Sequence, residues 1–69
     1  MAVNYYYNYA ELDSDNMCIA VVTTTSDDSA NPAYVPIPVY DEEYLLKYYI
    51  DGNWYEDAEG TIPWTSSLI

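Results

Sequence analysis

The side chains that usually carry catalysis are almost absent from this chain. It has no histidine, one cysteine (Cys18) and one basic residue (Lys47). Without an imidazole there is no usual base to activate a hydroxyl or thiol nucleophile. Cys18 stands among apolar residues, where a thiol is more often buried than reactive, and Lys47 is expected to pair with an acid. The sequence therefore predicts a protein that is not an enzyme.

Carboxylates are plentiful, and two groups of them could in principle do chemistry. Paired carboxylates hydrolyse glycosidic bonds, but those enzymes need a cleft that a 69-residue chain can rarely build. Asp13-x-Asp15 opens like a calcium loop, yet Met17 occupies the next alternate position and no glycine or terminal glutamate follows. Residues 41–43 (Asp-Glu-Glu) fit the start of a helix better than a ligand set. We expect no metal and no other cofactor.

The charge balance excludes several classes of partner. Twelve Asp and Glu residues against one Lys give a formal net charge of -11. Direct binding of DNA or RNA needs clustered Lys and Arg, and an anionic membrane surface would repel the chain. Residues 1–10 lack the basic and apolar regions of a secretory signal, and the chain, which starts at Met1, is expected to be complete. Such a charge favours solubility and a basic protein partner.

A chain this small is expected to be stabilised by a binding partner or by self-association. A 69-residue chain forms one domain with a thin core, and small proteins usually add a disulfide, a metal or self-association. A single cysteine excludes an internal disulfide. The chain has ten tyrosines, two tryptophans and no phenylalanine. Tyrosine and tryptophan suit partly solvent-exposed sheet faces and interfaces better than a fully apolar core. We therefore expect several copies or a protein neighbour.

The elements that must position these aromatic residues are strands. Residues 4–12 and 17–25 predict two strands around an Asx turn at residues 13–16. Residues 34–40 contain two prolines, which predicts an extended or edge segment. Residues 41–46 start with acids and are too short for more than about one helical turn. Asp51-Gly52 between aromatic segments predicts a second hairpin with a type I′ turn.

These elements predict an all-β fold with at most one short helical turn near 41–46. Each hairpin is marginal alone, so we expect the two hairpins and the edge segment to form one small antiparallel sheet. Residues 1–60 form the predicted domain, and residues 61–69 an uncharged C-terminal tail. The tail should dock either on its own sheet or on a neighbour, and we favour the neighbour because tryptophan is a typical interface anchor.

Candidate partner-binding residues are the aromatic side chains of the strands and the apolar side chains of the tail. They are Tyr5, Tyr7, Tyr49, Trp54, Tyr55, Ile62, Trp64, Leu68 and Ile69.

The order of turns and aromatics resembles small β modules of tailed-bacteriophage structural proteins. The resemblance covers residues 5–57: a hairpin around an Asp/Asn turn (9–19), an Ile-Pro-x-Tyr-Asp-type segment (35–46) and a hairpin closing on Gly-x-Trp (47–55). Such modules belong to tails, fibres or shell-associated proteins. The resemblance carries over no functional residue, and the acidic surface and uncharged tail depart from the pattern.

The resulting functional hypothesis is a non-catalytic phage virion protein. It would be a minor tail, baseplate, fibre-associated or capsid-decorating subunit that binds other virion proteins or itself through a Tyr/Trp face. The alternative is an acidic DNA mimic in the host cytoplasm that inhibits a DNA-binding or defence enzyme. A third class is sugar binding through Tyr49, Trp54 and Tyr55, because aromatic rings stack on sugars.

Overall fold

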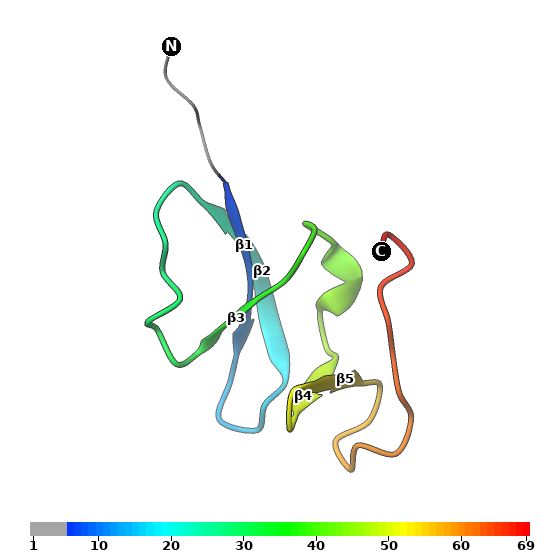
Figure 1. The fold of residues 1–69 in the computed structure, drawn as a ribbon. Helices are drawn as coiled ribbons and strands as arrows, with labels where there is room; N and C mark the ends of the chain where they lie inside the picture. Colours follow the sequence, from blue (N-terminus) through cyan, green and yellow to red (C-terminus); the bar gives the residue numbers. More distant parts are fainter. Residues whose placement is uncertain (1–5) are drawn as a thin grey trace.

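The chain folds into two small antiparallel sheets connected by a single turn of 3-10 helix (Figure 1). The structure is a computed structural model that describes residues 6–69. The all-β fold predicted from the sequence is confirmed. Within the described residues the elements are β1 (Tyr7–Leu12), β2 (Cys18–Thr24), β3 (Tyr34–Pro36), η1 (Glu42–Tyr44), β4 (Tyr48–Ile50) and β5 (Asn53–Tyr55).

The first sheet contains three strands in the order β2-β1-β3. Its hairpin turns where the sequence predicts: the Asp13 carboxylate accepts hydrogen bonds from the backbone N–H of Asp15 (2.8 Å) and Met17 (3.0 Å). Asn16 has a φ of 65°, a left-handed conformation that asparagine tolerates. This Asx turn fixes the register in which Tyr9 lies opposite Val22.

The edge segment is also confirmed, as the short strand β3. Tyr9 lies opposite Pro36 in the β1–β3 ladder. The pairing continues just beyond the strand, where the N–H of Ile37 donates to the carbonyl of Asn8 at 3.0 Å. Pro36 therefore stands at a position whose missing N–H is not needed for the ladder.

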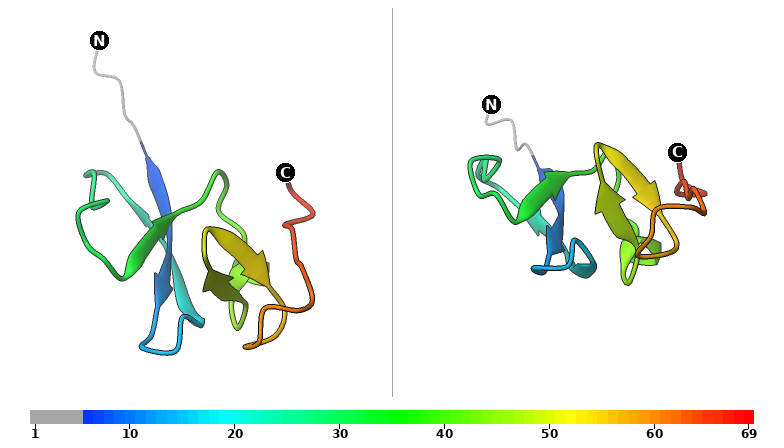
Figure 2. Two further views of the ribbon diagram at one scale, coloured as in Figure 1. Left: turned by 60° about the horizontal axis from the view of Figure 1, so that its bottom comes forward. Right: turned by 90° about the horizontal axis from the view of Figure 1, so that it is seen from below.

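The second hairpin forms its own sheet, β4–β5, instead of joining the first, so the expectation of one sheet is wrong. Leu46 has a φ of 68°, which turns the chain after η1 and brings β4 against only the start of β2. The contact is a single bridge between Met17 and Tyr48, with Cys18 N–H donating to the Lys47 carbonyl at 2.8 Å. Figure 2 shows the two sheets beside each other with separate strand directions.

Asp51 and Gly52 form the predicted type I′ turn, with φ values of 51° and 85°. A Cβ at Gly52 would meet no atom within 4 Å, so backbone strain alone opposes a side chain. We expect Gly52→Ala to lower the free energy of unfolding by about 1 kcal/mol. Asp51→Asn, which keeps a residue that accepts positive φ, should change it by less than about 0.5 kcal/mol. Urea unfolding followed by tryptophan fluorescence measures both, and equal losses would contradict this reading of the turn.

The core lies between the first sheet and η1. Its fully buried members include Ala10, Cys18, Ile37 and Tyr44. Tyr44 enters this core because Asp41, the first of the acids expected to start a helical turn, caps η1 by accepting a hydrogen bond from the Glu43 N–H at 2.9 Å. The short helix therefore orients one tyrosine ring towards the sheet.

The opposite side of β1 carries Tyr9, which is also buried. Its ring stacks on Tyr34 at 5.3 Å, and its hydroxyl donates to Asp27 (3.3 Å) and accepts from the Asp28 N–H (3.0 Å). These contacts hold the polar loop 25–33 against the sheet. Burial, as the largest cause, raises the pKa of the Tyr9 phenol.

Across residues 6–69, the structure contains no helix whose length and hydropathy would suit a membrane crossing.

Candidate binding site

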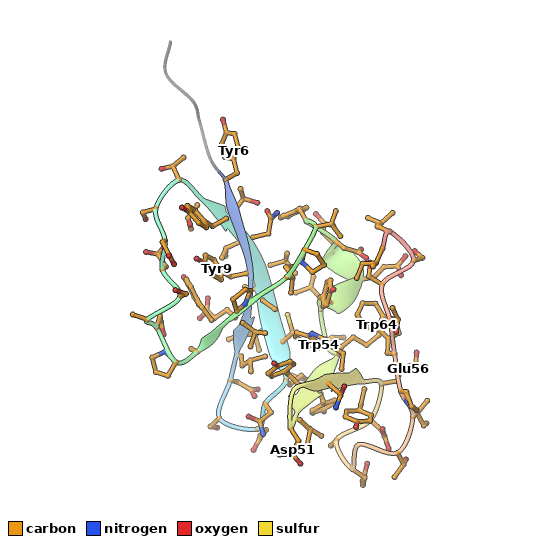
Figure 3. All side chains as sticks on the ribbon, in the orientation of Figure 1. Tyr6, Tyr9, Asp51, Trp54, Glu56 and Trp64 are labelled. Atoms are coloured by element: carbon orange, nitrogen blue, oxygen red, sulfur yellow. The ribbon has the colours of Figure 1, made fainter. Side chains whose placement is uncertain are left out.

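Three aromatic side chains from three different elements meet beside the core. Tyr44 of η1 contacts the edge of Trp54 of β5, with ring centroids 4.9 Å apart and planes at 71°. It makes the same kind of contact with Trp64 of the tail, at 4.8 Å and 79°. Tyr49 adds a tilted contact to Trp54 at 5.0 Å. Edge-to-face packing of this kind stabilises beyond simple burial, and Figure 3 shows Trp54 and Trp64 facing the same region.

The C-terminal tail is held in place by β5 of its own chain. Ile62 accepts a hydrogen bond from the Glu56 N–H (2.8 Å), and Trp64 donates to the Trp54 carbonyl (3.0 Å). Pro63 lies between these bonds as the non-hydrogen-bonded partner of Tyr55, so its missing N–H costs nothing. The preference for docking on a neighbour is therefore wrong for residues 62–66.

A buried polar contact fastens the end of the tail to η1. Asp41 and Ser66 are only 6% and 3% exposed. The Ser66 hydroxyl donates to one oxygen of the Asp41 carboxylate, whose other oxygen caps η1. The Leu68 N–H donates to the Ser66 oxygen at 3.1 Å. Sequence reasoning found the cap at Asp41 but missed Ser66, because nothing local links two residues 25 positions apart.

Between β5 and the tail the surface is hollowed over a volume of about 460 Å³. We call this the aromatic hollow. Although the chain carries twelve acids, no charged side chain lines it. Its lining is Tyr44, Gly52, Asn53, Trp54, Tyr55, Pro63, Trp64, Thr65, Ser66 and Ile69.

The structure brings together four of the residues proposed from the sequence, namely Trp54, Tyr55, Trp64 and Ile69. Tyr49 supports the hollow from behind through Trp54. Sequence reasoning missed the other six lining residues, which are Tyr44, Gly52, Asn53, Pro63, Thr65 and Ser66.

The remaining proposed residues lie elsewhere. Ile62 and Leu68 are exposed but are not part of the lining. Tyr7 is half-buried on β1 opposite Thr24, in the other sheet. Tyr5 lies outside the described residues.

Cys18 and Lys47, the two potentially reactive side chains, both have structural contacts. Cys18 is fully buried, its thiol donates to the Ala20 carbonyl at 3.3 Å, and burial is the main cause that raises its pKa. The Lys47 ammonium lies 5.1 Å from the centroid of the Trp64 ring, a cation–π contact where the sequence suggested an acid partner. In the part of the chain that the structure describes, no three acidic or cysteine side chains gather as metal ligands would.

Many of the acids serve the local backbone. Asp13, Asp27, Asp41 and Asp57 each accept hydrogen bonds from backbone N–H groups in turns or at the start of η1. An acid held this way builds a turn and has less freedom to imitate a row of phosphates. A third of the acidic residues thus have a structural reason to be present.

Asp57 gives the stability a predictable dependence on pH. Its carboxylate accepts from the Thr61 hydroxyl and from the N–H groups of Thr61 and Ile62, both at 2.9 Å, and these bonds, the Thr61 side chain first, lower its pKa. Because the folded pKa lies below the unfolded value of about 3.9, the contribution is present above that pH and is lost as the pH falls through the folded pKa.

We therefore expect Asp57→Asn to lose less stability than the wild type between pH 5 and pH 2, measured by urea unfolding. The matched control Glu59→Gln removes the same charge at an exposed position and should keep the wild-type pH profile over that range. If Asp57→Asn follows the wild-type profile, the carboxylate contributes nothing to the turn.

Comparison of the chain with models of protein families, with curated proteins and with solved structures finds no match.

Proposed function

We propose that this chain is a non-catalytic structural or assembly protein of a bacteriophage particle that attaches to a neighbouring virion protein through the aromatic hollow. It would serve as a minor tail, baseplate, fibre-associated or capsid-decorating subunit in several copies. The proposal joins the resemblance of residues 5–57 to such modules with one structural observation. That observation is an open hollow with two half-buried tryptophans and no charged side chain in its lining, on a chain of net charge -11.

The surface beside the hollow is apolar as well. Leu68 and Ile69 are 60% and 70% exposed, and Ile69 forms part of the lining. A large exposed apolar patch on an otherwise polar protein marks an interaction surface. The partner that fits is an apolar or aromatic side chain of a neighbouring protein, because that group would be buried among rings without meeting a charge.

Sugar binding through the same rings is less well supported. A sugar needs a free aromatic face on which to stack. Lys47 lies over the Trp64 ring, and Trp54 contacts both Tyr44 and Tyr49. The rings are thus engaged with one another and with a cation.

The DNA-mimic alternative rests on the charge of -11. Against it, three aspartates are held in turns and a fourth at the start of η1, and no charged side chain lines the hollow. A DNA mimic would bind a basic enzyme with an affinity that falls steeply as salt increases. Attachment by apolar burial would change little over the same range.

A matched pair of charge substitutions tests the site. Thr65 is exposed and lines the hollow, and Thr25 is exposed at the end of β2, away from it. Thr65→Glu should reduce attachment to purified phage particles at least tenfold, because a carboxylate would have to be desolvated in an apolar contact. Thr25→Glu, which adds the same charge, should attach like the wild type. Equal attachment of both variants would exclude the hollow as the contact, and equal loss would indicate dependence on total charge.

A further inference from the structure

The sheet edges of this protein are protected unequally. β4 has its outer edge against residues 16–18, through Cys18 N–H to Lys47 carbonyl (2.8 Å) and Tyr49 N–H to Asn16 carbonyl (2.9 Å). β5 is covered by residues 62–64 of the tail. Both edges of the second sheet therefore have backbone partners within the chain.

The outer edge of β3 is closed by its own residues. The strand is only three residues long, and Pro36 has no N–H to offer. The N–H of Tyr34 donates to the Asn31 carbonyl at 3.0 Å. A further strand would find little to pair with on this side.

The outer edge of β2 is covered at its start, where Cys18 exchanges backbone hydrogen bonds with Leu46 and Lys47, and is open beyond that point. The Ile37 N–H donates to the Asn8 carbonyl, so the backbone groups of Asn8 point to β3 and those of the next residue, Tyr9, point to β2. Tyr9 lies opposite Val22, which places the backbone groups of Val21 and Thr23 on the outer side. These groups have no hydrogen-bond partner among residues 6–69.

β2 keeps one of the usual defences of an edge strand, a register shift opposite Glu11 and Leu12, but lacks the others. Natural edges are blunted by charged side chains or proline, yet residues 16–26 contain neither. In the sequence, Asp27 and Asp28 follow the open part of the strand, whereas Asp13 and Asp15 lie beyond the end that Leu46 and Lys47 cover.

We infer that the outer edge of β2 beyond Cys18 is a strand-addition site for an extended segment of another protein, uncharged where it pairs and basic at the end beside Asp27 and Asp28. The open backbone groups of Val21 and Thr23 would form the ladder, and the two aspartates would attract the basic end. This edge lies in the first sheet, whereas the aromatic hollow lies between β5 and the tail.

Charge decides between a foreign strand and a second copy of this chain. Each copy carries a net charge of -11, and two copies paired along β2 would bring these like charges together. Repulsion opposes that dimer, whereas a segment with a basic end is attracted to Asp27 and Asp28.

Amide hydrogen exchange, measured by NMR, tests the site with two synthetic peptides, KKTVTITKK and EETVTITEE. In the free protein the amides of Val21 and Thr23 should exchange at least tenfold faster than that of Val22, which is bonded to Tyr9. The basic peptide should slow exchange at Val21 and Thr23 at least tenfold at saturation, and the acidic peptide should not. Thr23→Pro, which removes one outward N–H, should bind the basic peptide at least tenfold more weakly than Thr23→Val, which keeps it.

Four outcomes would overturn the inference. The edge is not open if the Val21 and Thr23 amides are as protected as Val22 in the dilute free protein. Equal effects of the two peptides, or no effect of either, would remove the proposed occupant. If the protection of the Val21 and Thr23 amides increases with protein concentration in the absence of peptide, the edge binds a second copy. If Thr23→Pro fails to fold, the exchange rates of the wild type decide the matter alone.

Discussion

Removal of residues 61–69 will unfold the isolated protein, whereas removal of residues 68–69 alone will leave it folded. The longer deletion takes away Trp64, whose burial against Tyr44 is worth about 2–3 kcal/mol. It also removes the hydroxyl that donates to the Asp41 carboxylate, which costs about 1–3 kcal/mol more. A chain of this size has a stability of about 3–10 kcal/mol, so these losses use up most or all of it.

The shorter deletion is the matched control for the longer one. Leu68 and Ile69 are exposed, so their loss removes little burial, while residues 62–66 keep their bonds to β5 and η1. Far-UV circular dichroism and thermal unfolding compare the two truncated proteins with the full chain. A chain ending at residue 60 that melts cooperatively at the wild-type temperature would show that the tail is not part of the fold.

The contact between Asp41 and Ser66 should show strong energetic coupling. Asp41→Ala removes the cap of η1 and orphans the buried Ser66 hydroxyl, for an expected loss of about 2–4 kcal/mol. Ser66→Ala leaves the carboxylate buried with one partner fewer, for a loss of about 1–3 kcal/mol. Because both changes break the same contact, the double variant should be no less stable than Asp41→Ala, within about 0.5 kcal/mol.

Urea unfolding of the single and double variants measures this coupling. Ser67→Ala is the matched control, since Ser67 is the exposed neighbour of Ser66, and it should change stability by less than about 0.5 kcal/mol. If the losses of Asp41→Ala and Ser66→Ala add fully in the double variant, the two side chains act independently and the buried contact is not a fastening point.

The features that the sequence predicted correctly are those set by neighbouring residues. The Asx turn at Asp13, the type I′ turn at Asp51-Gly52 and the cap at Asp41 each depend on a side chain and the backbone within four positions. Proline likewise limits residues 34–36 to an edge strand, because it lacks an N–H. Local stereochemistry is enough for such predictions.

The errors concern contacts between distant parts of the chain. Whether the hairpins share a sheet depends on the turn at Leu46, where a positive φ has no sequence signal comparable to glycine or asparagine. The tail is expected on a neighbour because tryptophan is a typical interface anchor, yet Trp64 packs against Tyr44 of its own chain. In the structure Pro63 occupies the position of the bridge that needs no N–H, and strand pairing continues on both sides of it.

The candidate site was predictable in its residue types more than in its geometry. Tryptophan and tyrosine near the C-terminal half pointed to Trp54, Tyr55 and Trp64, which do line one hollow. Tyr44 was missed because its role depends on η1 turning it inward, towards two rings that are 10 and 20 residues away. Tyr7 was included by composition alone and lies in the other sheet.

The number of copies of this chain in purified phage particles, counted by quantitative mass spectrometry before and after a wash from 0.05 to 0.5 M salt, tests the proposed function most directly. Particles from cells that produce the chain should contain a fixed number of copies, and that number should survive the wash because burial in the aromatic hollow does not depend on screened charges. Absence of the chain from intact particles, or complete release by the wash, would contradict the account and favour an acidic protein that acts on a basic enzyme.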